Sequence, residues 1–220
     1  VVNEAAGTSS TSSTISFGVL VGADSTVENA GSIATRGGNA AGVRFGDGSS
    51  LTNSGSITTA GQGAEVVVGG ANNAIANSGT IQSTGNFARA IELGEGFTLT
   101  NSGDIIAVGR AVTTTDNADI TNSGTISAVE EEGIQLASGS VTNQAGGSFS
   151  GTVCIAAAPG ASDPLTVANF GAINGSAADA GTGRIDAVVF GDGNDEFQQW
   201  TGASTAGWVD LGMGDATFVL

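Results

Sequence analysis

The sequence predicts an all-β fold, a right-handed parallel β-helix (solenoid) of about nine coils with 21–26 residues per coil. A seven-residue phrase with asparagine in third place recurs at a nearly fixed spacing. Between its copies lie short apolar runs with a period of two, which is typical of strands. No window places apolar residues at helical spacing over ten or more positions, because Gly and Asn interrupt the chain every few residues.

The phrase begins with an apolar residue, has Asn third and Gly fifth, and ends on Ile, as in 27–33. It recurs at 51–57, 75–81, 99–105 and 120–126, and more loosely at 141–143 and 167–173. Its asparagines are Asn29, Asn53, Asn77, Asn101, Asn122, Asn143 and Asn169, so the steps are 24, 24, 24, 21, 21 and 26 residues. A period in this range indicates a solenoid whose coils stack about 4.8 Å apart.

These seven asparagines are predicted to form a structural ladder. The apolar residue two positions before each Asn and the Ile four positions after it point inward. We place the Asn at the bend between two strands, where its short side chain tolerates a positive φ. Stacked in register, the amides can hydrogen-bond along the column, as they do in cross-β stacks. Seven evenly spaced copies of one residue favour this architecture over a ligand-binding role.

A second apolar run completes each coil. Its alternating pairs are Val43 and Phe45, Val66 and Val68, Ile91 and Leu93, Ile134 and Leu136, Val153 and Ile155, and Val188 and Phe190. Each coil therefore holds about three short strands and three bends. One coil cannot bury its apolar residues alone, but a stack of coils buries them in a continuous interior column.

Residues 1–220 are predicted to form a single β-helix that is a fragment of a longer rod. Residues 1–173 hold the asparagine-ladder coils, and 174–220 hold Gly-Asp-rich terminal coils with longer loops. The chain begins inside a coil, because Asn3 precedes Asn29 by 26 residues. Phe197 and Phe218 are predicted to open two further coils. Nine turns then give a rod about 43 Å long.

Composition limits the possible partners. Five arginines, no lysine and 21 acidic residues give a net charge of −16. Such a surface repels phosphate backbones and anionic membranes, so nucleic-acid binding is rejected, whereas it suits solubility, low-affinity cation binding or a basic partner. Glu130–Glu132 is interpreted as a solvated corner. Cys154 alternates with Val153 and Ile155 and is interpreted as a buried filler and not as a nucleophile.

One motif raises the possibility of calcium. Residues 191–195, Gly-Asp-Gly-Asn-Asp, partly match the nonapeptide that binds calcium in tandem repeats. The nearest partner, 212–215, lies a full coil away, so an acidic β-bend is the favoured interpretation. If calcium binds, the expected ligands are Asp192, Asp195, Asp210 and Asp215. No other cofactor is expected.

An enzyme acting on polysaccharide is the alternative function. It needs paired carboxylates on one face, for which the candidates are Asp116, Asp119, Asp186, Asp192 and Asp195. Arg44, Arg89 and Arg110 are placed in successive coils, where they line one face or pair with Glu65, Glu92 and neighbouring acids. The absence of His excludes a Ser-His-Asp protease and a His-ligated metal. We therefore expect no enzymatic activity.

Three longer loops are predicted, at 156–164, 174–184 and 198–207. Trp200 and Trp208, the only tryptophans, flank the third loop. Exposed Trp can stack on sugars or anchor a protein partner. The equally weighted alternative is that both rings cap the apolar column where the asparagine ladder stops.

The repeats at 51–57, 75–81, 99–105 and 120–126 resemble the passenger β-helices of bacterial autotransporters (type V secretion). The late run 191–197, Gly-Asp-Gly-Asn-Asp-Glu-Phe, looks like coils found toward the end of such passengers. The resemblance covers nearly the whole chain. It implies an extracellular protein on the bacterial outer-membrane surface, or a secreted one, usually an adhesin. The membrane link of that family is a translocator barrel, and no tract of ten-residue alternating strands follows here.

The leading expectation is therefore a structural, adhesive rod that mediates cell–cell, matrix or host contact through proteins or glycans. A further alternative is a calcium-dependent secreted repeat protein that self-assembles head to tail or side by side into filaments. A β-helix terminus exposes a turn of unpaired backbone, which suits end-to-end joining. The cut-fragment interpretation of the two ends is favoured over this one.

Overall fold

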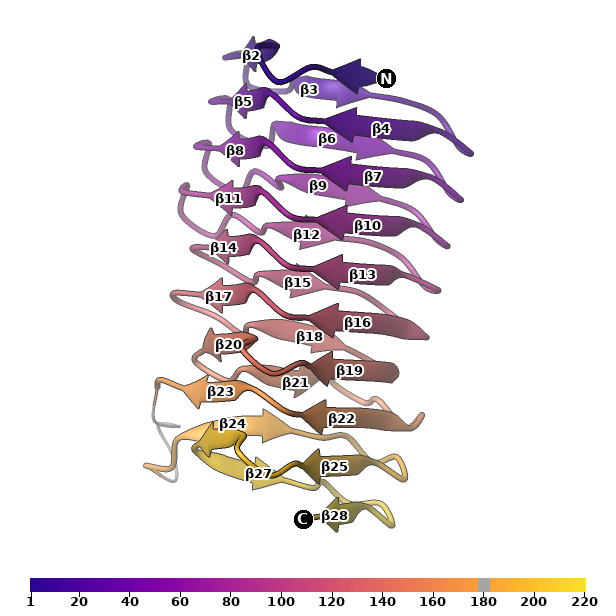
Figure 1. The fold of residues 1–220 in the computed structure, drawn as a ribbon, viewed down its shortest axis with the longest axis vertical. Helices are drawn as coiled ribbons and strands as arrows, with labels where there is room; N and C mark the ends of the chain where they lie inside the picture. Colours follow the sequence, from indigo (N-terminus) through magenta and orange to yellow (C-terminus); the bar gives the residue numbers. More distant parts are fainter. Residues whose placement is uncertain (178–182) are drawn as a thin grey trace.

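The computed structural model, which describes residues 1–177 and 183–220, confirms the predicted solenoid (Figure 1). The described residues form 28 strands and no helix. The strands lie in three parallel sheets, which stack as about nine turns. Strands at the front of Figure 1 point left while the chain descends from its N-terminus, so the coil is right-handed. Among the described residues no helix is long and apolar enough to cross a membrane.

Each turn contributes one strand to each sheet. The first sheet contains β1 (Val2–Asn3), β4 (Thr26–Asn29), β7 (Ser50–Asn53), β10 (Ala74–Asn77), β13 (Thr98–Asn101), β16 (Ala118–Asn122), β19 (Gly139–Asn143), β22 (Leu165–Asn169), β25 (Glu196–Gln199) and β28 (Thr217–Val219). The second contains β2 (Thr8–Thr11), β5 (Ser32–Thr35), β8 (Ser56–Thr59), β11 (Thr80–Ser83), β14 (Asp104–Ala107), β17 (Thr125–Ala128), β20 (Ser148–Gly151), β23 (Ala172–Gly175) and β26 (Ser204–Ala206). The third contains β3 (Phe17–Leu20), β6 (Ala41–Phe45), β9 (Val67–Gly69), β12 (Ile91–Glu92), β15 (Val112–Thr113), β18 (Ile134–Leu136), β21 (Ile155–Ala157), β24 (Asp186–Val189) and β27 (Trp208–Asp210).

Like residues stack on like residues from turn to turn. In the first sheet Val27 pairs with Leu51, Leu51 with Ile75, and Ile75 with Leu99. All four side chains are at most 2% exposed. The second and third sheets supply parallel columns, which are Ile33, Ile57, Ile81, Ile105 and Ile126, and Val43, Val67, Ile91, Val112 and Ile134. Because each strand is flanked by a copy of itself, these columns merge into one apolar core.

The shorter repeats have a local cause. Between β11 and β12 the corner spans residues 84–90, whereas between β14 and β15 it spans only 108–111. The three missing residues account for the change in period from 24 to 21. The chain shortens at the corner between the second and third sheets, so the register of the sheets is kept.

Two of the three predicted long loops need comment. The loop predicted at 198–207 is wrong, because Gln198 and Gln199 complete β25, and β26 begins at Ser204. A tight turn joins these strands and is closed by the backbone N–H of Ala203, which donates to the carbonyl of Trp200 at 3.0 Å. Of the loop predicted at 174–184, the first two residues belong to β23, and residues 178–182 lie outside the described residues.

Candidate functional site: the amide ladder and its outer ridge

The seven asparagines of the repeated phrase lie in one buried column. Each is the last residue of its first-sheet strand and is at most 2% exposed. The side-chain Nδ2 of each donates to the Oδ1 of the next at 2.7–3.1 Å. Asn3 extends the column before Asn29, and Gln199 extends it after Asn169.

The ladder amides are saturated by bonds within the chain. Asn101 is representative: its Nδ2 also donates to the carbonyl of Gly103 at 3.0 Å and to that of Thr125, one turn on, at 3.1 Å. Buried amides that already have their partners within the chain serve as structure. The column therefore fixes the bend after each first-sheet strand and does not present a binding surface.

The positive φ predicted for the ladder asparagines is wrong. Positive φ occurs instead at other asparagines, namely Asn39, Asn72 and Asn117. The ladder residues are extended strand ends whose side chains point inward, and the bend follows them. The physical reason is that an inward amide needs strand geometry to reach the amide 4.8 Å away in the next turn.

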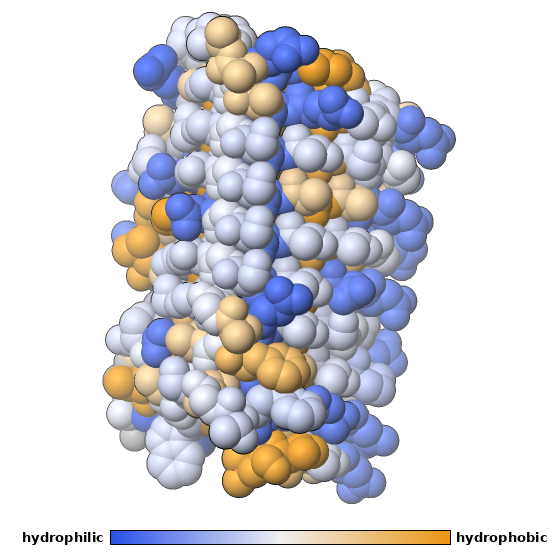
Figure 2. All heavy atoms as spheres, viewed as in Figure 1, coloured by the Kyte–Doolittle hydropathy of each residue, from blue (hydrophilic) through white to orange (hydrophobic). Residues whose placement is uncertain are grey.

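An outer ridge runs beside the ladder, formed by the residue that follows each ladder position. Along the chain it consists of Glu4, Ala30, Ser54, Ser78, Ser102, Ser123, Gln144, Phe170 and Trp200. This single structural position thus changes from small and polar to aromatic over the last turns. Figure 2 shows a pale vertical stripe of near-neutral hydropathy along the face of the rod that it presents.

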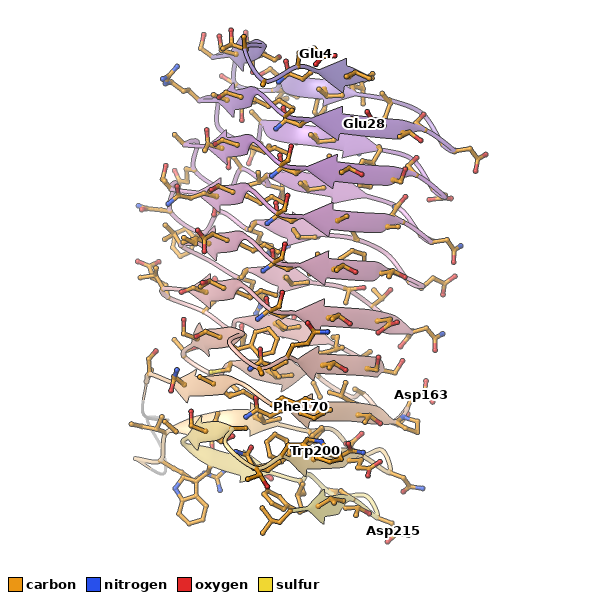
Figure 3. All side chains as sticks on the ribbon, in the orientation of Figure 1. Glu4, Glu28, Asp163, Phe170, Trp200 and Asp215 are labelled. Atoms are coloured by element: carbon orange, nitrogen blue, oxygen red, sulfur yellow. The ribbon has the colours of Figure 1, made fainter. Side chains whose placement is uncertain are left out.

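The two aromatic residues of the ridge form an exposed pair. Phe170 is 37% exposed and Trp200 is 50% exposed. Their rings stack with centroids 5.0 Å apart and planes inclined by 14° (Figure 3). Stacked rings in contact lie about 3.5–4 Å apart face to face, so this stack is offset and leaves part of each face uncovered.

Trp208 lies elsewhere, at the start of β27 in the third sheet. The guanidinium of Arg184 lies 5.8 Å from the centre of its ring and also pairs with Asp210. Hydrogen bonding to Arg184 lowers the pKa of the Asp210 carboxyl. Trp208 borders a cavity of about 860 Å³ at the C-terminal end, which Phe197 and Phe218 also line. Trp200 does not border this cavity, so the two tryptophans occupy different surfaces.

The four aspartates proposed for calcium are not gathered into one site. Asp192 and Asp215 are exposed on corners, and Asp210 faces Arg184. Asp195 is buried, and its Oδ1 accepts a hydrogen bond from the backbone N–H of Leu165 at 2.8 Å. Within 1–177 and 183–220, no three His, Cys, Asp or Glu side chains are placed to hold a metal ion.

Asp195 belongs instead to a second, shorter set of inward polar residues that sequence reasoning missed. At the corner before the first sheet, Ser49 and Asn73 each accept a hydrogen bond from the backbone N–H one turn earlier, at 3.0 and 2.7 Å. Ser138 does the same for Asn117 at 3.0 Å. The sequence did hold a sign of this set, because Ser49, Asn73 and Asp195 each stand one residue before a first-sheet strand.

Three of the five carboxylates considered for polysaccharide chemistry, Asp119, Asp186 and Asp195, have structural partners. Asp119 accepts a hydrogen bond from the hydroxyl of Ser140 at 2.8 Å, and Asp186 lies 2.6 Å from the guanidinium of Arg184. Asp116 lies at the corner before β16 and Asp192 at the corner before β25. Asp116 and Asp119 belong to one turn, and Asp186, Asp192 and Asp195 belong to another, three turns further along the rod.

The arginines need one correction. Arg89 and Arg110 lie in successive turns, but Arg44 lies two turns before Arg89, because the turn of β9 lies between them. In that intervening turn Glu65 takes the place that Arg89 has in the next turn, since each stands two residues before the paired residues Val67 and Ile91. Arg44 stands 5.5 Å from the ring centre of Phe17. Arg89 pairs with Glu92, while burial raises the pKa of the nearby Glu65 carboxyl.

The two remaining candidates have ordinary structural surroundings. Cys154 is fully buried, and burial raises the pKa of its thiol to about 12, which disfavours the reactive thiolate. Of the acidic run 130–132, Glu130 is exposed, whereas Glu131 and Glu132 lie 3.6 and 2.7 Å from the guanidinium of Arg110. The corner is thus partly an ion-pair network.

Comparison of this chain with protein-family models, with curated proteins and with solved structures found no match. The fold and the contacts described above are therefore the grounds for a functional proposal.

Proposed function

We propose that this chain is a structural, adhesive rod, exposed on a bacterial surface or secreted, that contacts cells, matrix or a host through its lateral surfaces. The observation that carries the proposal is the unbroken amide ladder beside an outer ridge that ends in exposed aromatic rings. A ladder that runs through every turn from Asn3 to Gln199 makes the coil stiff, and the ridge sets outward side chains at the regular spacing of the turns.

The Phe170–Trp200 pair is the proposed contact point of the rod. Its rings are exposed, offset and held by the backbone of two adjacent turns, so little conformational freedom is lost on binding. Offset aromatic faces suit the apolar face of a sugar ring or an apolar side chain of a partner protein. The resemblance of the repeats to autotransporter passengers supports the surface-exposed location.

The test is binding of the purified chain to arrays of glycans and of matrix and host-surface proteins. We expect binding to at least one class, and we expect Trp200→Ala to weaken it at least about tenfold. Ile15→Ala is the matched control, because Ile15 is an exposed apolar residue at the opposite end of the rod (75% exposed), and its loss should change nothing.

Two results would contradict the proposal. One is a folded chain that binds none of these surfaces. The other is release of sugar fragments from a panel of polysaccharides, which would assign the chain to the enzymes. A circular dichroism spectrum of each variant that matches the wild-type spectrum excludes misfolding as the cause of lost binding.

A further inference from the structure

One corner of the rod carries a bulky residue in a strained backbone conformation. Phe87 has a φ of 57°, the left-handed region that disfavours side chains with a Cβ, and its side chain is 63% exposed. A buried Phe could offset such strain by core packing, but this one lies mostly in solvent. Strain retained at an exposed position points to a function.

The neighbouring turns show what this corner requires. Three successive turns carry the same four-residue bend, 37–40, 61–64 and 85–88, each closed by an alanine N–H that donates to a glycine carbonyl at 3.2–3.4 Å. The third residue of each bend has a positive φ, and it is Asn39, Gly63 and Phe87 in turn. Asn and Gly are the residues that suit this position. Phe87 therefore carries backbone strain at a position where Asn and Gly, in the two preceding turns, are accommodated with less strain.

Phe87 does not stand alone at this corner. Val108 and Val129 follow at the same corner in the next two turns, half-buried and 63% exposed respectively. Apolar side chains gather at the left margin of Figure 2, at the level of β11 to β17. Arg89 and Arg110 flank them. We call this set, Phe87, Val108 and Val129 with Arg89 and Arg110, the Phe87 corner.

The charge around the rod is unevenly divided. All five arginines, Arg36, Arg44, Arg89, Arg110 and Arg184, lie at the corner between the second and third sheets or in the third-sheet strand that follows it, together with the acidic residues Glu65, Glu92, Glu130, Glu131, Glu132, Asp186 and Asp210. The corner between the third and first sheets instead carries acidic residues in most turns, namely Asp24, Asp47, Glu95, Asp116, Asp163, Asp192 and Asp215. Figure 3 shows Asp163 and Asp215 on that margin. The acidic corner therefore repels a second molecule with the same net charge of −16, whereas the side that carries both signs of charge can pair with its own copy.

We propose that the Phe87 corner binds the Phe87 corner of a second copy of this chain. The patch has an apolar centre and a rim with both signs of charge, as Arg110 lies beside Glu131 and Glu132. Such a rim is complementary to itself across a two-fold axis, because the arginine of one copy can meet the glutamates of the other. The contact joins two rods side by side as a closed pair. It does not depend on the proposed adhesive function, which places its contact on the Phe170–Trp200 ridge.

The test is sedimentation velocity of the full chain from micromolar to submillimolar concentration. We expect a reversible monomer–dimer equilibrium, and we expect Phe87→Asn to weaken it at least about tenfold. The same variant should raise the melting temperature by about 2–4 °C, because Asn relieves the strain that Phe carries. If Phe87 instead stabilised the fold by packing, the Phe87→Asn variant would have a lower melting temperature than the wild type.

Two variants separate the contact from folding effects. Val129→Asn should weaken the dimer without raising the melting temperature, since Val129 is not among the residues with positive φ. Trp200→Ala lies on the other ridge and should leave the dimer unchanged, while it tests the adhesive proposal independently.

Three results overturn the inference. They are a wild-type chain that stays monomeric over the whole range, a Phe87→Asn variant that associates as the wild type does, and a fall in melting temperature for that variant. An open series of oligomers that persists in Phe87→Asn would place the contact at the ends of the rod and would also overturn it.

Discussion

Each ladder asparagine has two neighbours of its own kind, and removing one affects both. In Asn101→Ala the Nδ2 of Asn77 keeps only its longer bonds to the carbonyls of Gly79 and Asp104, at 3.2 and 3.3 Å, and the Oδ1 of Asn122 loses its donor. Asn122 is buried, and a buried polar group without a partner costs about 1–3 kcal/mol.

We therefore expect Asn101→Ala to lower the free energy of unfolding by about 2–4 kcal/mol in urea denaturation. Thr100→Ala is the control, because Thr100 lies in the same strand but points into solvent, and its change should stay within about 0.5 kcal/mol. Equal effects of the two substitutions would mean that the ladder adds no stability beyond that of the strand.

At the level of residues, the sequence allowed the ladder to be placed because its asparagines repeat with the turns. The backbone angle was assigned wrongly, since Asn suits both an inward strand end and a left-handed bend. The structure gives the second role to Asn39, Asn72 and Asn117. Gln199 was missed because it stands 30 residues after Asn169, outside the earlier range of steps, and because it replaces Asn with a longer amide.

The bend between the first and second sheets depends on close backbone contact between turns. A Cβ added at Gly103 would lie 2.1 Å from the carbonyl oxygen of Gly79 and 2.7 Å from the carbonyl carbon of Ser78. The same short distance of 2.1 Å recurs at Gly55, Gly79 and Gly124. Glycine is required at this place in the phrase because of its contact with the preceding turn, and not because of its own φ.

Gly103→Ala is accordingly expected to lower the free energy of unfolding by about 2–3 kcal/mol, because the backbone of one turn must move away from the next. Gly22→Ala is a suitable comparison, since nothing lies within 4 Å of a Cβ built there. Thermal melting followed by circular dichroism measures both. A Gly103→Ala variant as stable as Gly22→Ala would show that the turns separate at little cost.

Element order was predictable, and element ends were less so. Alternating apolar residues identified the strands and their inward faces, because every turn must place apolar side chains into the same core. The corners face solvent and have no such requirement. For that reason the strands β25 and β26 were expected as a loop at 198–207, and Arg44 was placed in the turn next to Arg89.

The whole molecule should behave as a one-dimensional stack. Central turns have neighbours on both sides, and the outermost turns have one. Hydrogen exchange measured by mass spectrometry is therefore expected to be slowest in the turns from β7 to β17 and fastest in β1–β3 and β26–β28. Uniform exchange along the rod would instead indicate that all turns open together.

The surface of the rod could be predicted only in part. Net charge and the two tryptophans were visible in the sequence, but the gathering of the arginines on one side of the rod depends on how many residues each corner holds. Phe87 gave no signal at all, because a single Phe between two repeats looks like core. Its strain became visible only when its turn was stacked beside those of Asn39 and Gly63.

The side-chain amides from Asn3 to Asn169 all donate in the same direction, from each turn to the next turn along the chain, and Gln199 accepts the last of these bonds. Their dipoles consequently add, and each bond polarises the next. The buried column gives the rod an electrical polarity along its axis, with carbonyl oxygen facing the N-terminal direction and amide hydrogen facing the C-terminal direction. A charged group that approaches along the axis can thus distinguish one direction of the rod from the other.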